Sequence, residues 1–200
     1  YNPETGDRRI SGSTASLAGL EIAIHNQNQD QINEAIDRIV LGYTIVYGFG
    51  GLPLLYMGDE LGLLNDHSYR ENIEESGDNR WMHRPYFPQE DGPYSTSVAQ
   101  ELTQRLTLLA TARKALPALH ARQTTRVSST SAPAVSFVTR EGEFGQLLEI
   151  YNVSENNITL DLAELPYPIE PVDLITGHSV VVTGDALHIP AFAAFWVGPA

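Results

Sequence analysis

Apolar positions in the first half of the chain repeat with the spacing of helices. One set recurs every three or four residues and so lies on one helix face: Ile32, Ala35, Ile36, Ile39, Tyr43 and Val46. With Asp30 as N-cap and glycines from Gly48 onward as the stop, this pattern predicts a helix over about Gln31–Tyr47. A second pattern starts at Ser97–Gln100, which resembles a capping box, and Pro117 ends it. Its apolar side consists of Val98, Leu102, Leu106 and Leu109.

A short, uninterrupted apolar run, Leu52–Met57, stands between the two predicted helices. Such a run is typical of a strand that is buried on both faces, as in a parallel sheet covered by helices. Pro53 fits only near the start of this strand, where a missing amide donor is tolerated. A long polar segment follows, from Asp59 to about Thr96. Loops of this length inside compact proteins are usually functional.

From about Leu119 the pattern changes to short apolar runs separated by turn residues, which predicts an antiparallel β-sandwich. The runs are Ala134–Val138, Leu147–Val153, Ile158–Leu162, Val180–Val182 and Phe192–Val197. We therefore predict two domains: a piece of an α/β layer over residues 1–118 and a small all-β domain over residues 119–200. One strand and two helices do not close a core. We expect their apolar faces to need neighbours from a longer protein.

Composition narrows the classes of partner. The formal net charge of −13 disfavours nucleic acid, whose binding depends on Lys and Arg at the phosphates, and it disfavours an anionic membrane surface. A neutral ligand such as a sugar is indifferent to this charge. The absence of cysteine excludes disulfides, thiol nucleophiles and thiolate metal sites. It is compatible with the reducing cytoplasm and also with export, and no run reaches the ~18 apolar residues of a membrane span.

Three segments carry a resemblance to a known family. They are GDRRISGSTASLAGL at residues 6–20, GLPLLYMGDELG at 51–62 with LND at 64–66, and DNRWMHRP at 78–85. Together they resemble amylosucrases, members of the α-amylase superfamily that split sucrose and build an α-1,4-glucan. The second segment is widespread in that superfamily, whereas the first and third are much narrower. The resemblance spans most of the chain and weakens through the β domain.

The resemblance implies a (β/α)8 barrel followed by a C-terminal antiparallel β domain. Residues 1–118 would form the end of the barrel: the end of the loop after strand seven, helix seven, strand eight with its loop, and helix eight. Active sites of such barrels lie at the C-terminal ends of the strands, so the segment from Asp59 to Thr96 would belong to the catalytic face.

The catalytic carboxylates are expected to be missing from this chain. Retaining glycosyl transfer needs a nucleophile and an acid about 5 Å apart. The resemblance places both, and a third stabilising Asp, on strands four, five and seven, before Tyr1. Asp59 and Glu60 do not replace them, because adjacent residues of an extended chain point to opposite faces. We therefore assign no catalytic residue here and expect the 200-residue chain alone to be inactive.

What remains is substrate binding. Arg80 matches a family position that resembles the floor of the sucrose pocket, where an arginine pairs with an upstream Asp and touches the glucosyl unit. A planar guanidinium suits this role because it offers several fixed donors. The alternative is a loop arginine in a surface ion pair. Asp7 and Arg9 match positions that resemble sugar contacts on the acceptor side, although Arg8 stands where the family often has proline.

Other candidate residues favour structural roles. Trp81 and His83 fit packing and a hydrogen-bonded scaffold, and Arg84 fits a partner for nearby acids. Asp66 and His67 lack metal-ligand spacing to a second His, so we expect no metal and no cofactor. The β-domain aromatics lie within apolar runs, as core residues do: Tyr151, Phe192, Phe195 and Trp196.

The sequence therefore predicts the C-terminal part of an amylosucrase-like transglucosylase whose partners are sucrose and an α-glucan. Two alternatives stay open. The parent enzyme could be another sucrose- or maltose-acting relative, such as a sucrose hydrolase, trehalose synthase or sucrose phosphorylase, which the products formed from sucrose would distinguish. The chain could also be a non-catalytic carbohydrate-binding module, which a glycan titration would test.

Overall fold

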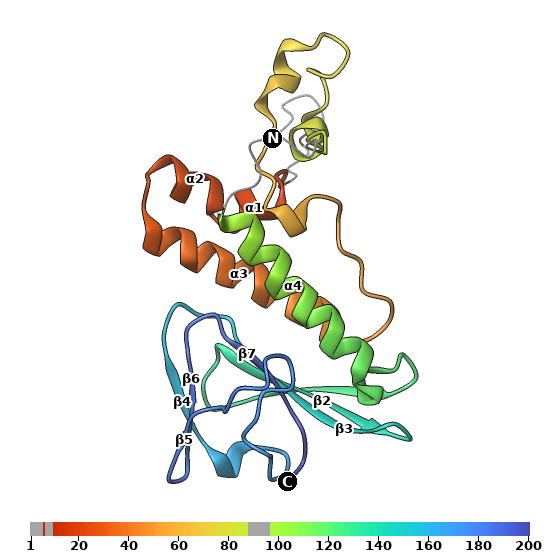
Figure 1. Ribbon diagram of the computed structural model, residues 1–200, viewed down its shortest axis with the longest axis vertical. Coiled ribbons are helices and arrows are strands. Elements are labelled where there is room, and N and C mark those ends of the chain that lie inside the picture. The colour runs from red at the N-terminus through yellow and green to blue at the C-terminus, as the bar shows by residue number, and fades with distance from the viewer. Residues whose placement is uncertain (1–5, 7–9, 88–96) are drawn as a thin grey trace. The chain divides into compact units, whose positions relative to one another are not determined.

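The computed structural model describes residue 6, residues 10–87 and residues 97–200 (Figure 1). The chain forms two compact units that alternate along the sequence. The described residues of the first unit belong to the ranges Tyr1–Ile39 and Tyr56–Thr103, and the second unit combines Val40–Leu55 with Gln104–Ala200. Each of the two long helices begins in the first unit and ends in the second. The domain boundary expected near residue 118 coincides with the change from helices to strands along the chain. As the boundary of a barrel it stays a prediction.

The first unit is helical. It contains α1 (Thr14–Leu17), α2 (Leu20–His25), the first part of α3 (Gln29–Gly48), the first turns of α4 (Ser97–Ala115), and the 3-10 helices η1 (Asp59–Leu61), η2 (His67–Glu71) and η3 (Asn79–His83). Helices α3 and α4 confirm the two helices predicted from apolar spacing. Of their predicted inward residues in this unit, Ala35, Ile36, Ile39 and Leu102 are buried, whereas Ile32 and Val98 are half-buried.

The strand predicted at Leu52–Met57 is absent, and that prediction is wrong for this structure. The segment forms no regular element, and Leu52 and Leu54 are 95% and 77% exposed. A strand exists only where a neighbouring strand satisfies its main-chain N–H and C=O groups. No other strand pairs with this segment within residues 10–87 and 97–200. The barrel portion expected from the resemblance therefore has no strand among the described residues, and it stays a prediction.

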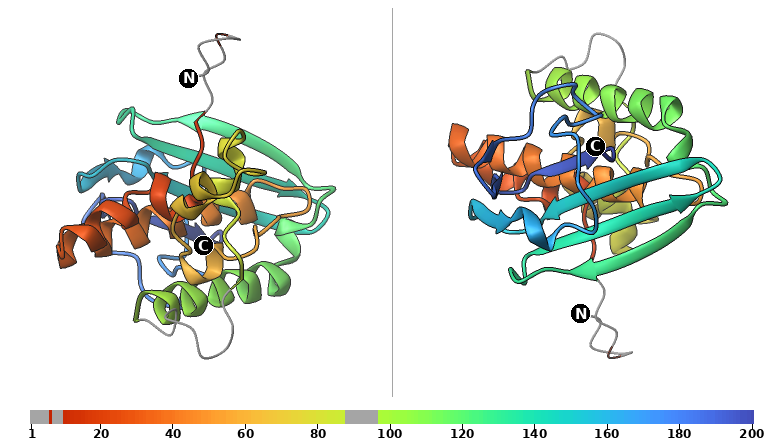
Figure 2. Two further views of the ribbon diagram at one scale, coloured as in Figure 1. Left: turned by 90° about the horizontal axis from the view of Figure 1, so that it is seen from above. Right: turned by 90° about the horizontal axis from the view of Figure 1, so that it is seen from below.

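The second unit contains two antiparallel sheets (Figure 2). One has the order β1-β2-β3-β7 and the other β4-β6-β5. Their bounds are β1 (Thr124–Ser129), β2 (Val135–Gly142), β3 (Gly145–Asn152), β4 (Ile158–Asp161), β5 (Val182–Thr183), β6 (Ala186–Ile189) and β7 (Ala194–Val197); the short helices η4 (Pro117–Leu119) and η5 (Leu162–Glu164) lie between them in sequence.

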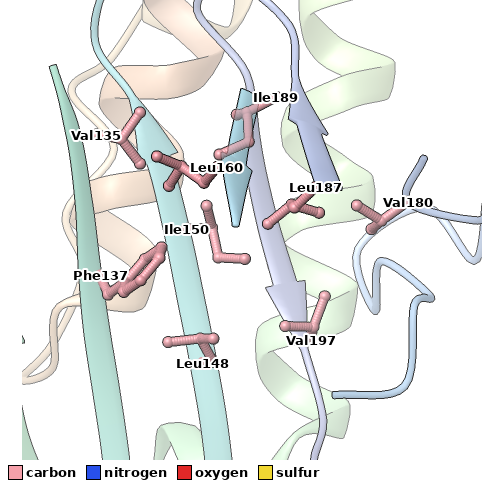
Figure 3. Packing of buried hydrophobic residues seen from close by; sticks show 9 residues of the cluster. All are labelled: Val135, Phe137, Leu148, Ile150, Leu160, Val180, Leu187, Ile189 and Val197. Carbon is pink, nitrogen blue, oxygen red and sulfur yellow. The ribbon is translucent and has the colours of Figure 1, made fainter. Parts of the chain in front are cut away.

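Side chains from both sheets form one apolar core, which confirms the predicted antiparallel sandwich (Figure 3). Phe137 and Ile150 from the larger sheet share this core with Leu160 and Leu187 from the smaller one. Two strands were not predicted. Strand β1 has the polar sequence TTRVSS and lies at a sheet edge, whereas β6 is a short run directly after the turn at Gly184.

The opposite face of the larger sheet is also covered. Leu41 of α3 packs with Val138 and Tyr151 of the sheet. On this side Arg140 is fully buried, and its guanidinium donates to the carbonyls of Ala118, Gly48 and His120 and to the Thr125 hydroxyl. Arg140 thus joins the end of α3, the segment after α4 and the edge of the sheet within one unit.

Glu149 is the second fully buried charge-bearing residue on this face. Burial raises the pKa of its carboxyl to about 7, although a hydrogen bond from Tyr151 and the charges of Arg140 and Arg113 oppose the shift. Its Oε1 has no hydrogen-bond partner among the residues that the structure describes. An ionised carboxylate with one unsatisfied oxygen is costly when buried. The protonated form of Glu149 is therefore favoured below neutral pH.

Gly48 provides a test of this packing. A Cβ built on Gly48 would collide with the Glu149 carboxylate and the Tyr151 hydroxyl. We expect Gly48→Ala to destabilise the second unit by about 1–3 kcal/mol, the usual effect of overpacking. Gly42→Ala is the matched control, because a Cβ on Gly42 of the same helix meets no atom within 4 Å. That control should gain about 0.5–1 kcal/mol from alanine's better helix propensity.

Urea unfolding of both variants checks the prediction. Trp196 is fully buried in β7, so its fluorescence reports the second unit once the other tryptophan is removed by Trp81→Phe. Equal stability of the two alanine variants would contradict the close packing at Gly48.

Candidate functional site

Arg80 lies in η3, at the centre of the polar segment that the sequence singles out. Asp78 is the N-cap of this helix and accepts a hydrogen bond from the Arg80 main-chain N–H. The same carboxylate binds the guanidinium through Nε at 2.9 Å and Nη2 at 2.6 Å. These side-chain hydrogen bonds lower the pKa of Asp78 to about 2 and raise that of Arg80. The turn therefore presents a firmly paired arginine.

One edge of the Arg80 guanidinium, with Nε and Nη2, binds Asp78, and the other edge is accessible to a ligand. The Arg80 side chain is 54% exposed, and Nη1 has no hydrogen-bond partner among the described residues. A guanidinium carries five N–H donors, of which the pair with Asp78 engages Nε and Nη2. The remaining donors can bind hydroxyl groups of a ligand. The same contacts also fit a surface ion pair, so the pocket role predicted for Arg80 stays a prediction.

The neighbours of Arg80 support the turn. The Arg84 guanidinium lies 5.8 Å from the centre of the Trp81 ring, and its charge contributes to the low pKa of Asp78. Trp81 is 37% exposed. The hydrogen-bonded scaffold role expected for His83 is not met at Nδ1, which is buried without a partner within the described part of the chain.

The other candidates take different positions. Asp59 is buried and accepts a hydrogen bond of 2.6 Å from the Thr14 hydroxyl. Glu60 accepts one from the Gly58 main-chain N–H. Both carboxylates thus have hydrogen-bond partners within the first unit. Asp7 and Arg9 lie outside the described residues, so their acceptor-side role stays a prediction.

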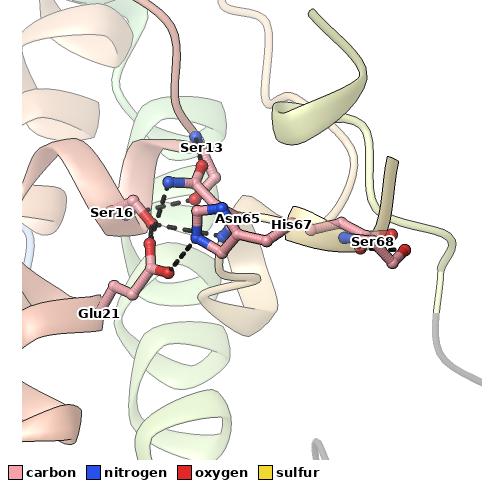
Figure 4. A network of polar contacts seen from close by, with 7 residues as sticks. Ser13, Ser16, Glu21, Asn65, His67 and Ser68 are labelled. Carbon is pink, nitrogen blue, oxygen red and sulfur yellow. Dashed lines mark hydrogen bonds and ion pairs between the residues drawn. The ribbon is translucent and has the colours of Figure 1, made fainter. Parts of the chain in front are cut away.

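A polar network in the first unit was not predicted from the sequence (Figure 4). The Glu21 carboxylate of α2 accepts hydrogen bonds from the Ser16 hydroxyl and from Nδ2 of Asn65, and it pairs with His67 Nε2 at 2.9 Å. Asn65 Oδ1 in turn accepts from the Ser13 main-chain N–H. The network therefore joins α1 and α2 to the loop before η2.

Electrostatics keep Glu21 ionised. Its partial burial would raise the pKa, but hydrogen bonds from Ser16 and His67, the charge of His67 and the Asn65 main-chain N–H together hold the pKa below its usual value. The only sequence signal for this network was the Leu64-Asn65-Asp66 motif, since nothing in the sequence pairs Glu21 with a histidine 46 residues away.

Two surface hollows accompany these features. One, of about 460 Å³, lies beside the Glu21 network in the first unit. The other, of about 680 Å³, lies in the second unit and is mostly apolar, with Leu165, Tyr167 and Ile169 in its wall. Within residues 10–87 and 97–200 no three His, Asp or Glu side chains gather as metal ligands. No helix in this part of the chain is long and apolar enough to cross a membrane.

Residues 125–198 match the family model of the amylosucrase C-terminal domain. Solved structures share the fold. AmyP in complex with maltose is 18% identical with a TM-score of 0.63, over 84% of this chain and 36% of its own. The α-glucosyl transfer enzyme XgtA is 22% identical with a TM-score of 0.58, over 82% and 35%. An Anoxybacillus α-amylase is 21% identical with a TM-score of 0.56, over 90% and 35%.

These comparisons define the class of fold. The second unit contains an antiparallel β domain that matches the amylosucrase C-terminal domain model, and the chain shares its fold with part of each of these solved structures. The chain spans about a third of the length of the structures it matches.

Proposed function

We propose that the chain is the C-terminal part of an amylosucrase-like retaining transglucosylase, which splits sucrose and transfers the glucosyl unit to an α-1,4-glucan. The observation that carries this proposal is the match of residues 125–198 to the amylosucrase C-terminal domain. The narrow segments at residues 6–20 and 78–85 support it from the other part of the chain.

In this proposal the chain binds sugars and does not perform the bond exchange. The nucleophile, the acid and the stabilising Asp belong to the preceding barrel strands. Arg80 binds the glucosyl unit with the donors that its pair with Asp78 leaves available. Asp78 fixes the direction of the guanidinium, which reduces the conformational freedom lost when a sugar binds.

The acceptor is bound by the segment that contains Asp7 and Arg9. A charged hydrogen bond to the acceptor hydroxyls favours attack by sugar over attack by water, because correct placement of the acceptor makes transfer effectively intramolecular. The net charge of −13 is no obstacle, since both sucrose and glucan are neutral.

The experiment is product analysis with sucrose. The longer enzyme containing this chain should release fructose and form α-1,4-glucan, whereas the 200-residue chain alone should release none. Free glucose as the main second product would indicate a sucrose hydrolase. Glucose 1-phosphate formed with added phosphate would indicate a sucrose phosphorylase. Absence of sucrose turnover by the longer enzyme would contradict the proposal.

A further inference from the structure

The 460 Å³ hollow of the first unit has the form of a small-ligand site. It lies between α1, α2 and the loop before η2, and its wall includes Ser11, Leu17, Glu21, Ile22, His25 and His67. Its volume lies within the range of about 300–1,000 Å³ usual for ligand pockets. Such pockets combine apolar walls with a few placed polar groups.

The polar groups of the hollow are fixed and retain hydrogen-bonding capacity. An ionised carboxylate has about four lone-pair positions. Ser16, Asn65 and His67 occupy three of those of Glu21, which leaves one on Oε1. The His67 side chain is 52% exposed, and no residue in the described part of the chain binds its Nδ1. Nδ1 of His67 is therefore available to a ligand hydroxyl: it accepts a hydrogen bond when the ring is neutral with Nε2–H donating to Glu21, and it donates one when the ring is charged.

The apolar side chains in the wall of the hollow are exposed to solvent. Leu17 and Ile22 are 60% and 56% exposed, although both belong to short helices whose other faces are buried. Apolar side chains beside fixed acceptors suit a ligand with a C–H face and several hydroxyl donors. A sugar ring has this combination.

The charge of the hollow excludes other ligand classes. Among the described residues no Lys or Arg lines it, and Glu21 stays ionised because of its hydrogen bonds, which disfavours phosphates and carboxylates. A divalent cation lacks ligands there, since no group of three His, Asp or Glu gathers within the described residues. The ligand should therefore be neutral and rich in hydroxyl groups.

We propose that this hollow binds one glucosyl unit of an α-glucan, with Glu21 accepting a hydrogen bond from one of its hydroxyls, His67 Nδ1 hydrogen-bonded to another, and Leu17 and Ile22 contacting its C–H face. The identity of the sugar rests on the proposed function. The site itself rests on the geometry of the hollow.

The test is a titration of the isotope-labelled 200-residue chain with maltotriose, followed by the imidazole signals of its histidines. We expect saturable shifts of His67 and His25 at millimolar sugar, with no shift of His188 on strand β6. Inorganic phosphate should leave His67 unchanged. His67→Ala and Glu21→Gln should each weaken binding by roughly tenfold, the usual loss of a charged hydrogen bond.

Glu74→Gln is the matched control, because it removes an exposed carboxyl in the same unit but outside the hollow. It should leave maltotriose affinity unchanged. Absence of a saturable His67 shift, equal shifts with phosphate, or undiminished binding by a folded Glu21→Gln variant would each overturn the proposal. Product analysis with sucrose is a separate readout, so either result can fail while the other stands.

Discussion

The second unit should lose stability as the pH rises from about 4.5 to about 7, by about 3 kcal/mol. Glu149 causes this loss, because burial raises the pKa of its carboxyl from 4.5 to about 7. The folded unit then binds a proton that the unfolded chain has already released. Stability from this group is complete below pH 4.5 and decreases until the pH exceeds the folded-state pKa.

The groups around Glu149 determine the size of the effect. Tyr151 donates to its Oε2, and burial and Glu149 itself raise the pKa of Tyr151, so this hydroxyl keeps its proton throughout the range. The charges of Arg140 and Arg113 attract the ionised carboxylate, but both guanidinium groups donate hydrogen bonds to main-chain carbonyls. In the sheet register Glu149 pairs with Val138 of β2 and with Trp196 of β7.

The dependence of unfolding free energy on pH is measured by urea unfolding between pH 4.5 and pH 8. Trp196 fluorescence in a Trp81→Phe background reports the unfolding. Glu149→Gln should flatten the pH dependence, since the amide does not titrate. Glu155→Gln removes an exposed carboxyl of the same unit and should leave the slope intact. If Glu149→Gln retains the full pH dependence, another group is responsible.

Several parts of the fold could be predicted from local pattern. Helices α3 and α4 follow from apolar spacing with clear ends, and most of the sandwich follows from short runs between turns. Strand β1 could not be predicted, because an edge strand with polar side chains has no apolar alternation. The strand prediction for Leu52–Met57 was wrong for the opposite reason. The composition of this segment is typical of a strand, but a strand also requires a partner strand, which the sequence does not reveal.

The site was less predictable than the fold. Arg80 was found through a motif, and its local pair with Asp78 was not foreseen. Glu21 and His67 meet only through tertiary structure, from positions 46 residues apart. Glu149 is the one charged residue in the apolar run Leu147–Val153. It is buried because α3 and α4 residues of the second unit cover that face of the sheet, which no local pattern shows.

Arg80→Ala should lower sucrose turnover by roughly a hundredfold, the loss expected when two charged hydrogen bonds to the transition state are removed. This prediction concerns the longer enzyme of the proposed function. In the 200-residue chain the same substitution should change stability little, because the Asp78 and Arg80 side chains are 33% and 54% exposed there. Arg80→Lys should restore little activity, since one ammonium does not reproduce a guanidinium that binds Asp78 and a sugar together.

Arg84→Ala is the matched control, because Arg84 lies four residues away and contacts the Trp81 ring. It should retain most of the turnover. The decisive measurement is therefore kcat/KM for sucrose in folded Arg80→Ala and Arg84→Ala variants of the longer enzyme. The account predicts a loss of about a hundredfold for the first and a small loss for the second. Near-normal kcat/KM for Arg80→Ala would contradict both the pocket role of Arg80 and the proposed amylosucrase-like function.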